Sequence, residues 1–326
     1  NVSVWADRAR LFDSEVRRLS AETWLRSDGQ MMLGIQGEVN GTAADGLRAV
    51  NESLLGELVG GVFADWQAEG ELGTRLDLVI NLADRAAAPE VTVDTVWRDV
   101  DLRVDPGNLQ VQRVSGAVGY SSRAGFSSRD LQGSFWGRRL QASVLQLPGT
   151  DGRPEAGGGV LEIQLQAPVA VTDVREWLSL DSLSLASGEA AVDAVIRIAP
   201  GEPALLTVAS DLQGVALDLP LPWRKPAEEH RALRLEWPLG GEEPLLQLAL
   251  GTDLRLPLAL DGAQDSPTTG GLRGAALAFN GEPLAVEERK LRISGRAPLV
   301  RVQDWNQFVE RYFRAPGGDE VERQAG

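Results

Sequence analysis

The chain has 326 residues, which is enough for one to three domains with a large buried core. Its formal net charge of −15 argues against binding to nucleic acid, whose phosphates select Lys- and Arg-rich surfaces, and against docking on anionic lipid headgroups. The absence of cysteine excludes disulfides and thiolate chemistry.

The first 58 residues predict strands followed by a helix. Residues 1–39 are expected to form strands, with turns at residues 27–29 and around Gly37. Residues 42–58 carry apolar side chains at helical spacing, so they predict an amphipathic helix. Either Thr42 or Asp45 is suited to cap its N-terminus, because both side chains accept hydrogen bonds from free backbone amides.

From residue 71 to residue 147 the apolar pattern has the period of two that is typical of strands. One face of the first strand carries four apolar side chains, namely Leu76, Leu78, Ile80 and Leu82. The next strand changes parity between Val91, Val93 and Trp97 on one side and Val100, Leu102 and Val104 on the other. This change predicts a bulge or bend near Val96. Turns are expected at residues 105–108, 120–125 and 136–139.

The second half of the chain predicts more strands, separated by loose segments. Residues 150–159 and 261–271 are expected to form loop tips, and residues 315–326 a disordered tail. Apolar side chains alternate with polar ones in one strand, at Leu161, Ile163 and Leu165. They alternate again in two later stretches, at Leu246, Leu248 and Leu250 and then at Leu254, Leu256, Leu258 and Leu260.

A strand, an Ala-Pro pair and a short helix occur in this order twice. Pro168 precedes a predicted helix at 173–180, and Pro298 precedes another at 304–314. Asp173 and Asp304 are each followed three residues later by Glu or Gln, which predicts a capping box at each helix start. The repetition favours an architecture built by adding similar units, although two unrelated loops of the same kind would give the same pattern.

The residues needed for common catalytic sites are not found together in the sequence. His230 is the only histidine and lies in a charged segment, so a solvated loop residue is expected. Pairs of neighbouring glutamates lie in turn-like segments, and no phosphate-binding or nucleophile motif is present. We therefore predict no enzyme activity, no catalytic residue, no metal site and no cofactor. The nine tryptophans are spread along the chain, which favours packing in the core over a stacking platform.

Residues 210–226 combine a short alternating strand with a proline-rich exit, in the sequence SDLQGVALDLPLPWRKP. This stretch resembles a motif of the AsmA-like YhdP family of large envelope proteins, which are related in type to TamB. The family turn contains a glycine, whereas this chain has Trp223-Arg224-Lys225. Three other segments are similar to elements of the family, namely the hairpin at 116–136, the short helix at 171–178 and the segment at 299–308.

The resemblance implies a mainly β fold, a long curved antiparallel sheet that forms an open, taco-like groove with a few short amphipathic helices. It implies a periplasmic, inner-membrane-anchored protein of Gram-negative bacteria that carries phospholipid toward the outer membrane. The anchor would lie outside this chain, because no stretch approaches the ~20 apolar residues of a membrane helix. The start at Asn1 without methionine also favours an internal fragment.

We expect two β-rich sections of one continuous sheet, at 1–150 and 151–314. Phospholipid acyl chains are the expected ligand, and the helices would plug, gate or brace the groove. The expected groove residues are Leu76, Leu78, Ile80, Leu82, Leu161, Ile163, Leu165, Leu246, Leu248, Leu250, Leu254, Leu256 and Leu258. The alternative is a β-sandwich that buries these side chains between two sheets and binds protein or glycan.

Overall fold

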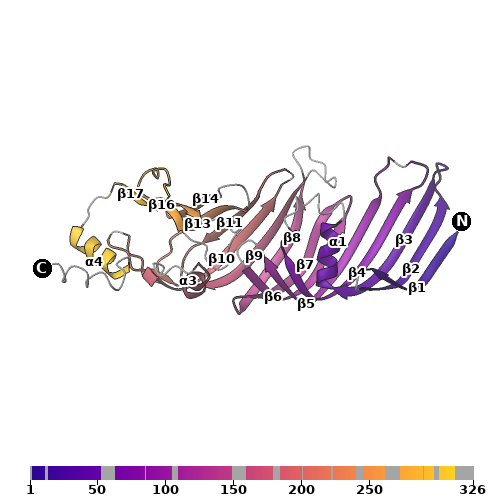
Figure 1. The fold of residues 1–326 in the computed structure, drawn as a ribbon, viewed down its shortest axis with the longest axis horizontal. Helices are drawn as coiled ribbons and strands as arrows, with labels where there is room; N and C mark the ends of the chain where they lie inside the picture. Colours follow the sequence, from indigo (N-terminus) through magenta and orange to yellow (C-terminus); the bar gives the residue numbers. More distant parts are fainter. Residues whose placement is uncertain are drawn as a thin grey trace, which may run out of the picture. The chain divides into compact units, whose positions relative to one another are not determined.

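Strands dominate the described part of the chain, as the period-two patterns predict (Figure 1). The computed structural model describes residues 2–11, 14–52, 63–84, 86–104, 109–148, 159–178, 184–199, 201–221, 223–239, 245–260, 272–288, 290–296 and 301–312. These residues form one long, open, mostly antiparallel sheet of seventeen strands, with three short helices. The prediction of a mainly β open sheet is confirmed, and the sandwich alternative does not fit.

The chain divides into two compact units. Unit 1 comprises Asn1–Ala167, Asp193–Thr207 and Pro238–Gly241. Unit 2 comprises Pro168–Val192, Val208–Trp237 and Glu242–Gly326.

In unit 1, each of the first eight strands pairs antiparallel with the strand that follows it. The strands are β1 (Ser3–Leu11), β2 (Ser14–Leu25), β3 (Met31–Thr42), β4 (Gln67–Asn81), β5 (Glu90–Val104), β6 (Leu109–Ser121), β7 (Gly125–Phe135), β8 (Arg138–Leu147) and β9 (Val160–Ala170). Helix α1 (Ala43–Asn51) follows β3, and the Thr42 hydroxyl accepts a hydrogen bond from the Asp45 amide. Thr42 is therefore the N-cap.

Bulges interrupt five of these strands, namely β2, β4, β5, β6 and β7. In β5 the register shifts between Trp97 and Val100, and Asp99 has a left-handed φ of 49°. This is the bulge that the parity change in the sequence predicts. Because one extra residue reverses the alternation of a strand, Val100 faces the same side as Trp97. The bulges thus keep one face apolar along strands of 11 to 15 residues, as β4, β5 and β7 illustrate.

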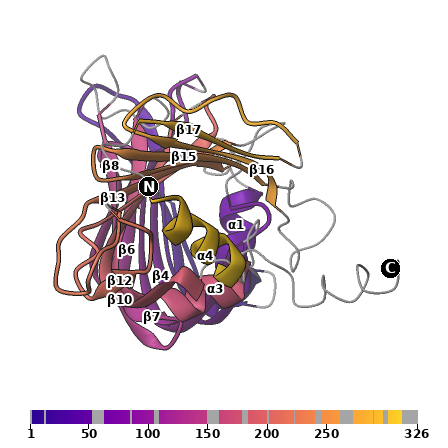
Figure 2. The ribbon, with the colours of Figure 1, turned by 90° about the vertical axis from the view of Figure 1, so that its left-hand side faces the viewer.

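Unit 2 contains the rest of the sheet and two helices. Its elements, some of which begin or end in unit 1, are α3 (Val171–Leu178), β10 (Ala186–Ile198), β11 (Ala204–Ser210), β12 (Val215–Leu217), β13 (Leu233–Leu239), β14 (Leu245–Leu250), β15 (Leu254–Leu260), β16 (Leu272–Phe279), β17 (Leu291–Gly295) and α4 (Val302–Tyr312). From β13 to β16 each strand pairs antiparallel with the one that follows it, whereas β17 pairs parallel to β16. Figure 2 shows β15, β16 and β17 side by side.

Three local predictions are wrong. Gly37 lies inside β3, where its missing side chain leaves room for Leu19, whereas the turn at 27–29 forms as expected. Helices α3 and α4 begin at Val171 and Val302, so Asp173 and Asp304 lie in the first turn and do not cap. A carboxylate in the first turn is still favourable, because the helix dipole is positive there.

Several sequence predictions concern residues outside the described ranges. These are the turn at 105–108, the end of the first predicted helix at 53–58, most of the loops at 150–159 and 261–271, and the tail at 315–326. Hairpin turns form at 122–124 and 136–137, as expected.

Candidate functional site

The strands of unit 1 have one apolar and one polar face, and their register shows which residues share each face. Residues that are directly opposite each other in an antiparallel pair point to the same side. Leu76 of β4 is opposite Val93 of β5, Val93 is opposite Tyr120 of β6, and Tyr120 is opposite Phe126 of β7. The Tyr120 and Phe126 rings pack with their centroids 4.9 Å apart. One apolar row therefore crosses four strands.

The same row reaches β9 through β8. The register places Ser127 opposite Leu145, so Phe126 lies opposite Gln146, which in turn is opposite Leu161 of β9. The amide of Phe126 donates to Gln146 Oε1 at 3.3 Å, which satisfies the one polar side chain in the row. Leu76 and Leu161, from two separate predicted groups, thus lie on a single face of unit 1.

Burial shows that much of this apolar face is not covered by a second layer. Along β5, Val91, Val93, Thr95 and Trp97 are only half-buried, and the residues between them are exposed. Leu76, Leu78 and Ile80 of β4 are half-buried too, and Leu82 is 45% exposed. Inward-facing residues on central strands of a sandwich are enclosed by the opposing sheet, so this pattern describes an open face.

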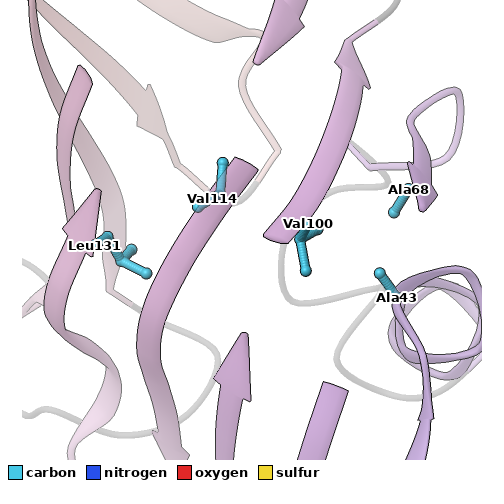
Figure 3. Close-up of a cluster of buried hydrophobic side chains, with 5 residues drawn as sticks. All are labelled: Ala43, Ala68, Val100, Val114 and Leu131. Carbon is cyan, nitrogen blue, oxygen red and sulfur yellow. The ribbon is translucent and has the colours of Figure 1, made fainter. Parts of the chain in front are cut away.

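Helix α1 covers the part of the face beyond the bulges. Ala43 of α1 faces Ala68 and Val100, and Val114 and Leu131 continue the same cluster on β6 and β7 (Figure 3). These five residues, here called the α1 cluster, are at most 8% exposed. Leu47, Leu72 and Trp97 pack around them. The apolar face is therefore closed on one side of the bulges and open on the other.

The opposite face of unit 1 is mostly polar and carries cross-strand contacts. Arg75 Nη2 of β4 lies 3.1 Å from Glu38 Oε1 of β3, and Gln36 donates to Asp77 at 3.0 Å. A shallow depression of about 310 Å³ is lined by Asp94, Ala117, Gly119, Ser127, Ser128 and Arg129, most of which belong to this face. Because its lining is polar, this depression is not part of the apolar face.

The β9 residues form a separate core in unit 1. Leu161 packs with Ile196, Ile198 and Ala204, and both Ile163 and Leu165 lie against this cluster. On the other face of β9, Glu162 is 6% exposed. Hydrogen bonds from Gln164 and then from Arg197 hold the pKa of this carboxyl below its usual value. These contacts let a carboxylate remain ionised within the sheet.

The predicted leucines of unit 2 lie opposite one another on two paired strands. The register joins Leu246 to Leu258, Leu248 to Leu256 and Leu250 to Leu254. Unlike the β4 residues, Leu246, Leu250 and Leu254 are at most 8% exposed. Leu250 and Leu254 form a cluster with Trp223 and Phe279, here called the Trp223 cluster. Trp305 of α4 packs against it, with its ring 5.9 Å from that of Trp223.

The 210–226 stretch contributes Trp223 to this cluster and also contains a buried lysine. Lys225 is 1% exposed, and its ammonium donates to the carbonyls of Leu212, Val215 and Pro226 at 2.8, 2.6 and 3.1 Å. Burial lowers the pKa of Lys225, against the attraction of nearby carboxylates such as Glu229. The stretch is therefore a structural clip, and the exposed His230 is attached to its start, with Nδ1 2.9 Å from Asp211 Oδ2.

The structure separates the thirteen expected groove residues into three settings. Leu76, Leu78, Ile80 and Leu82 lie on the open face, the β9 residues in a core of unit 1, and the β14 and β15 residues in unit 2 beside the Trp223 cluster. The sequence list omits other members of the apolar face, namely Leu25, Met31, Leu33, Ile35, Val91 and Val93 on its open part and the Tyr120–Phe126 pair, of which Tyr120 is only 8% exposed. Alternation at residues 31, 33 and 35 was a usable signal, whereas the Tyr120–Phe126 pair depends on the hairpin register.

Among the described residues, no helix has the length and apolar character needed to cross a bilayer. No group of three or more His, Cys, Asp or Glu side chains in the described ranges is arranged to hold a metal ion.

Comparison with known proteins gives one family match. The family model described as YhdP protein matches residues 1–326, which is the whole chain. Neither the curated proteins nor the solved structures include a significant match.

Proposed function

The chain belongs to the YhdP family, and from this membership and its open apolar face we propose that it carries phospholipid. In this proposal it is a segment of a periplasmic bridge, anchored elsewhere to the inner membrane, that moves lipid between the inner and outer membranes. Acyl chains contact the apolar face while headgroups stay in water. The chain has no catalytic role in this process.

The observation that carries the proposal is the open face of β4 and β5. Leu76, Leu78 and Ile80 are central in the sheet and yet only half-buried, which is unusual for aliphatic side chains unless another apolar surface covers them in use. The polar face, with contacts such as Glu38–Arg75, supplies solubility instead. An acyl chain provides an apolar surface that covers these side chains and can also dissociate from them.

The energy scale fits a carrier. Each methylene that is sheltered from water contributes about 0.8 kcal/mol, so a covered acyl chain gains on the order of 10 kcal/mol. An enclosed pocket would hold such a chain in one place. An open face offers many sites of similar free energy, so the chain can shift along it in small steps without re-exposing all its methylenes at once.

The test is lipid extraction from the purified 326-residue chain, followed by mass spectrometry. We expect phospholipid to copurify with the wild-type chain, and Leu78→Gln to bind about tenfold less, since a desolvated amide opposes binding by about 1–2 kcal/mol. Asp77→Asn is the matched control, because Asp77 is adjacent in β4 but lies on the polar face. A wild-type chain without lipid that also fails to take up fluorescent phospholipid from vesicles would overturn the proposal.

A further inference from the structure

Three exposed apolar side chains lie in one row at the end of strands β2, β3 and β4. Leu25 is opposite Met31 in the register, and the Leu82 amide donates to the Met31 carbonyl at 2.8 Å. They are 61%, 40% and 45% exposed, respectively. Isolated exposed apolar residues are ordinary, but a continuous group of them marks a contact surface. We call these three residues the rim row.

The rim row continues inward along the apolar face without a charged side chain. Counting by two along each strand, the next row contains Thr23, Leu33 and Ile80, and the one after it Ala21, Ile35 and Leu78. Leu76 and Gly37 follow. All the large side chains of these inner rows are half-buried. We call the surface from the rim row to Leu76 the open strip.

Helix α1 ends the open strip on the side away from the rim. Leu72, four residues before Leu76, packs against the α1 cluster, and its Cδ1 lies directly against Gly46 of α1. The six residue-to-residue steps from Leu76 to Leu82 span about 20 Å at the rise of a β-strand. One leaflet of a bilayer has a hydrocarbon thickness of about 15 Å, half that of the whole core. The strip therefore has the length of one acyl chain and not of two end to end.

The polar groups beside the strip gather at the rim. Arg26, which follows Leu25, pairs with Asp28 at 2.7 Å, and Arg123 pairs with Glu90 at 2.6 Å across the next hairpin end. All four side chains are 45% or more exposed. A headgroup at the rim would thus meet water and charges of both signs, whereas the residues that follow Leu76 on this face of β4, Thr74 and Leu72, are uncharged.

On the basis of the proposed function, we propose that the open strip holds a single phospholipid acyl chain that lies along the strands. Its terminal methyl group lies near Leu76 and its ester near Leu82 and Met31. The acyl chain enters over the rim row with its methyl end first, and α1 limits how far it advances along the strands.

The experiment is photolabelling of the full chain with phosphatidylcholine carrying a diazirine in one acyl chain. One probe has the diazirine beside the ester, and the other has it beside the terminal methyl group. We expect the first to label residues near Met31 and Leu82 and the second to label residues near Leu76 and Val93. Equal labelling of both regions by the two probes, or the reverse order, would overturn the inference.

A blocking variant gives an independent test. Ile35→Trp fills the strip and should reduce labelling at Leu76 at least fivefold, whereas Gln36→Trp, on the polar face of the same strand, should leave it unchanged. If Ile35→Trp does not fold, the wild-type photolabelling still decides. Because the chain has no cysteine, a single Leu78→Cys thiol can report cover directly. In the lipid-free chain it should react readily with a water-soluble maleimide, and protection would show that protein covers the strip.

The outcomes separate this inference from the proposed function. Copurified phospholipid with photolabelling confined to unit 2, at Leu246–Leu258 for example, would overturn the one-chain strip and leave lipid carriage standing. The absence of any bound lipid or label would overturn both.

Discussion

Lys225 is one of only two lysines in the chain, and the two are in opposite environments. Its ammonium is enclosed by three carbonyls, whereas the Lys290 side chain is 65% exposed and pairs with Glu287. An amine-reactive reagent should therefore modify Lys290 rapidly. Modification of Lys225 should be at least about a hundredfold slower, because Lys225 reacts only when the structure around it opens. Peptide mass spectrometry measures both rates in one sample. Similar rates in the folded chain would show that the clip at 210–226 opens freely.

The buried ammonium also predicts how stability depends on pH. Burial lowers the pKa of Lys225 below the usual 10.5, so between the two values the unfolded chain binds more protons than the folded one. The free energy of unfolding contributed by Lys225 therefore rises as the pH increases toward 10.5.

The measurement is urea unfolding of the wild type and Lys225→Met between pH 7 and pH 10. At pH 7 the variant should be less stable by about 1–3 kcal/mol, because three carbonyls lose their donor. The difference between wild type and variant should grow with pH. Lys290→Met is the matched control, since it leaves the Lys225 clip intact. A difference that shrinks with pH would mean that the ammonium is favoured in the folded state.

At the scale of elements, the bulges decide whether a long strand keeps one apolar face. Gly70 of β4 has a φ of 115°, and an added Cβ would lie 2.7 Å from the Asp99 carbonyl oxygen of the neighbouring bulge. Gly29 has a φ of 84°, but its Cβ position is free of contacts within 4 Å. Both positions favour glycine because of φ, and only Gly70 also needs the space.

Gly70→Ala should therefore destabilise the chain more than Gly29→Ala does. We expect about 1 kcal/mol for Gly29→Ala, from the left-handed backbone alone, and at least about 2 kcal/mol more for Gly70→Ala. Thermal or urea unfolding of the two variants measures the difference. Equal losses would show that the paired bulges of β4 and β5 move apart at little cost.

The same elements show how far the sequence predicts the fold. The bulge in β5 was predictable because valines mark both parities, at Val93 and Val100. The bulge in β7 was not, since Ser127 to Asp130 offers no apolar residue whose parity changes. The helix starts were misplaced because Asp173 and Asp304 suit a cap and a first turn almost equally well.

At the scale of the whole molecule, the alternation of apolar and polar residues does not predict which residues cover the apolar face of a strand. Leu78 in β4 and Leu250 in β14 have the same sequence context of alternate leucines, yet the first is half-buried on the open face and the second is 6% exposed beside Trp223. The residues that bury Leu250, such as Trp223, lie far from it in the sequence, so no local pattern predicts them. The site was thus predictable as a set of apolar strands, while its open part was not.

Net charge governs how the whole chain approaches a membrane surface. With −15 formal charges, it is repelled by anionic headgroups over a distance set by the salt concentration. We expect uptake of fluorescent phospholipid to be slower from vesicles with added phosphatidylglycerol than from pure phosphatidylcholine vesicles at low salt. The difference should vanish near 1 M salt, where the Debye length is about 3 Å. Stopped-flow fluorescence of the two vesicle types measures the rates. Faster uptake from the anionic vesicles at low salt would mean that local cations, such as Arg26 and Arg123 at the rim, outweigh the net charge and guide the headgroup.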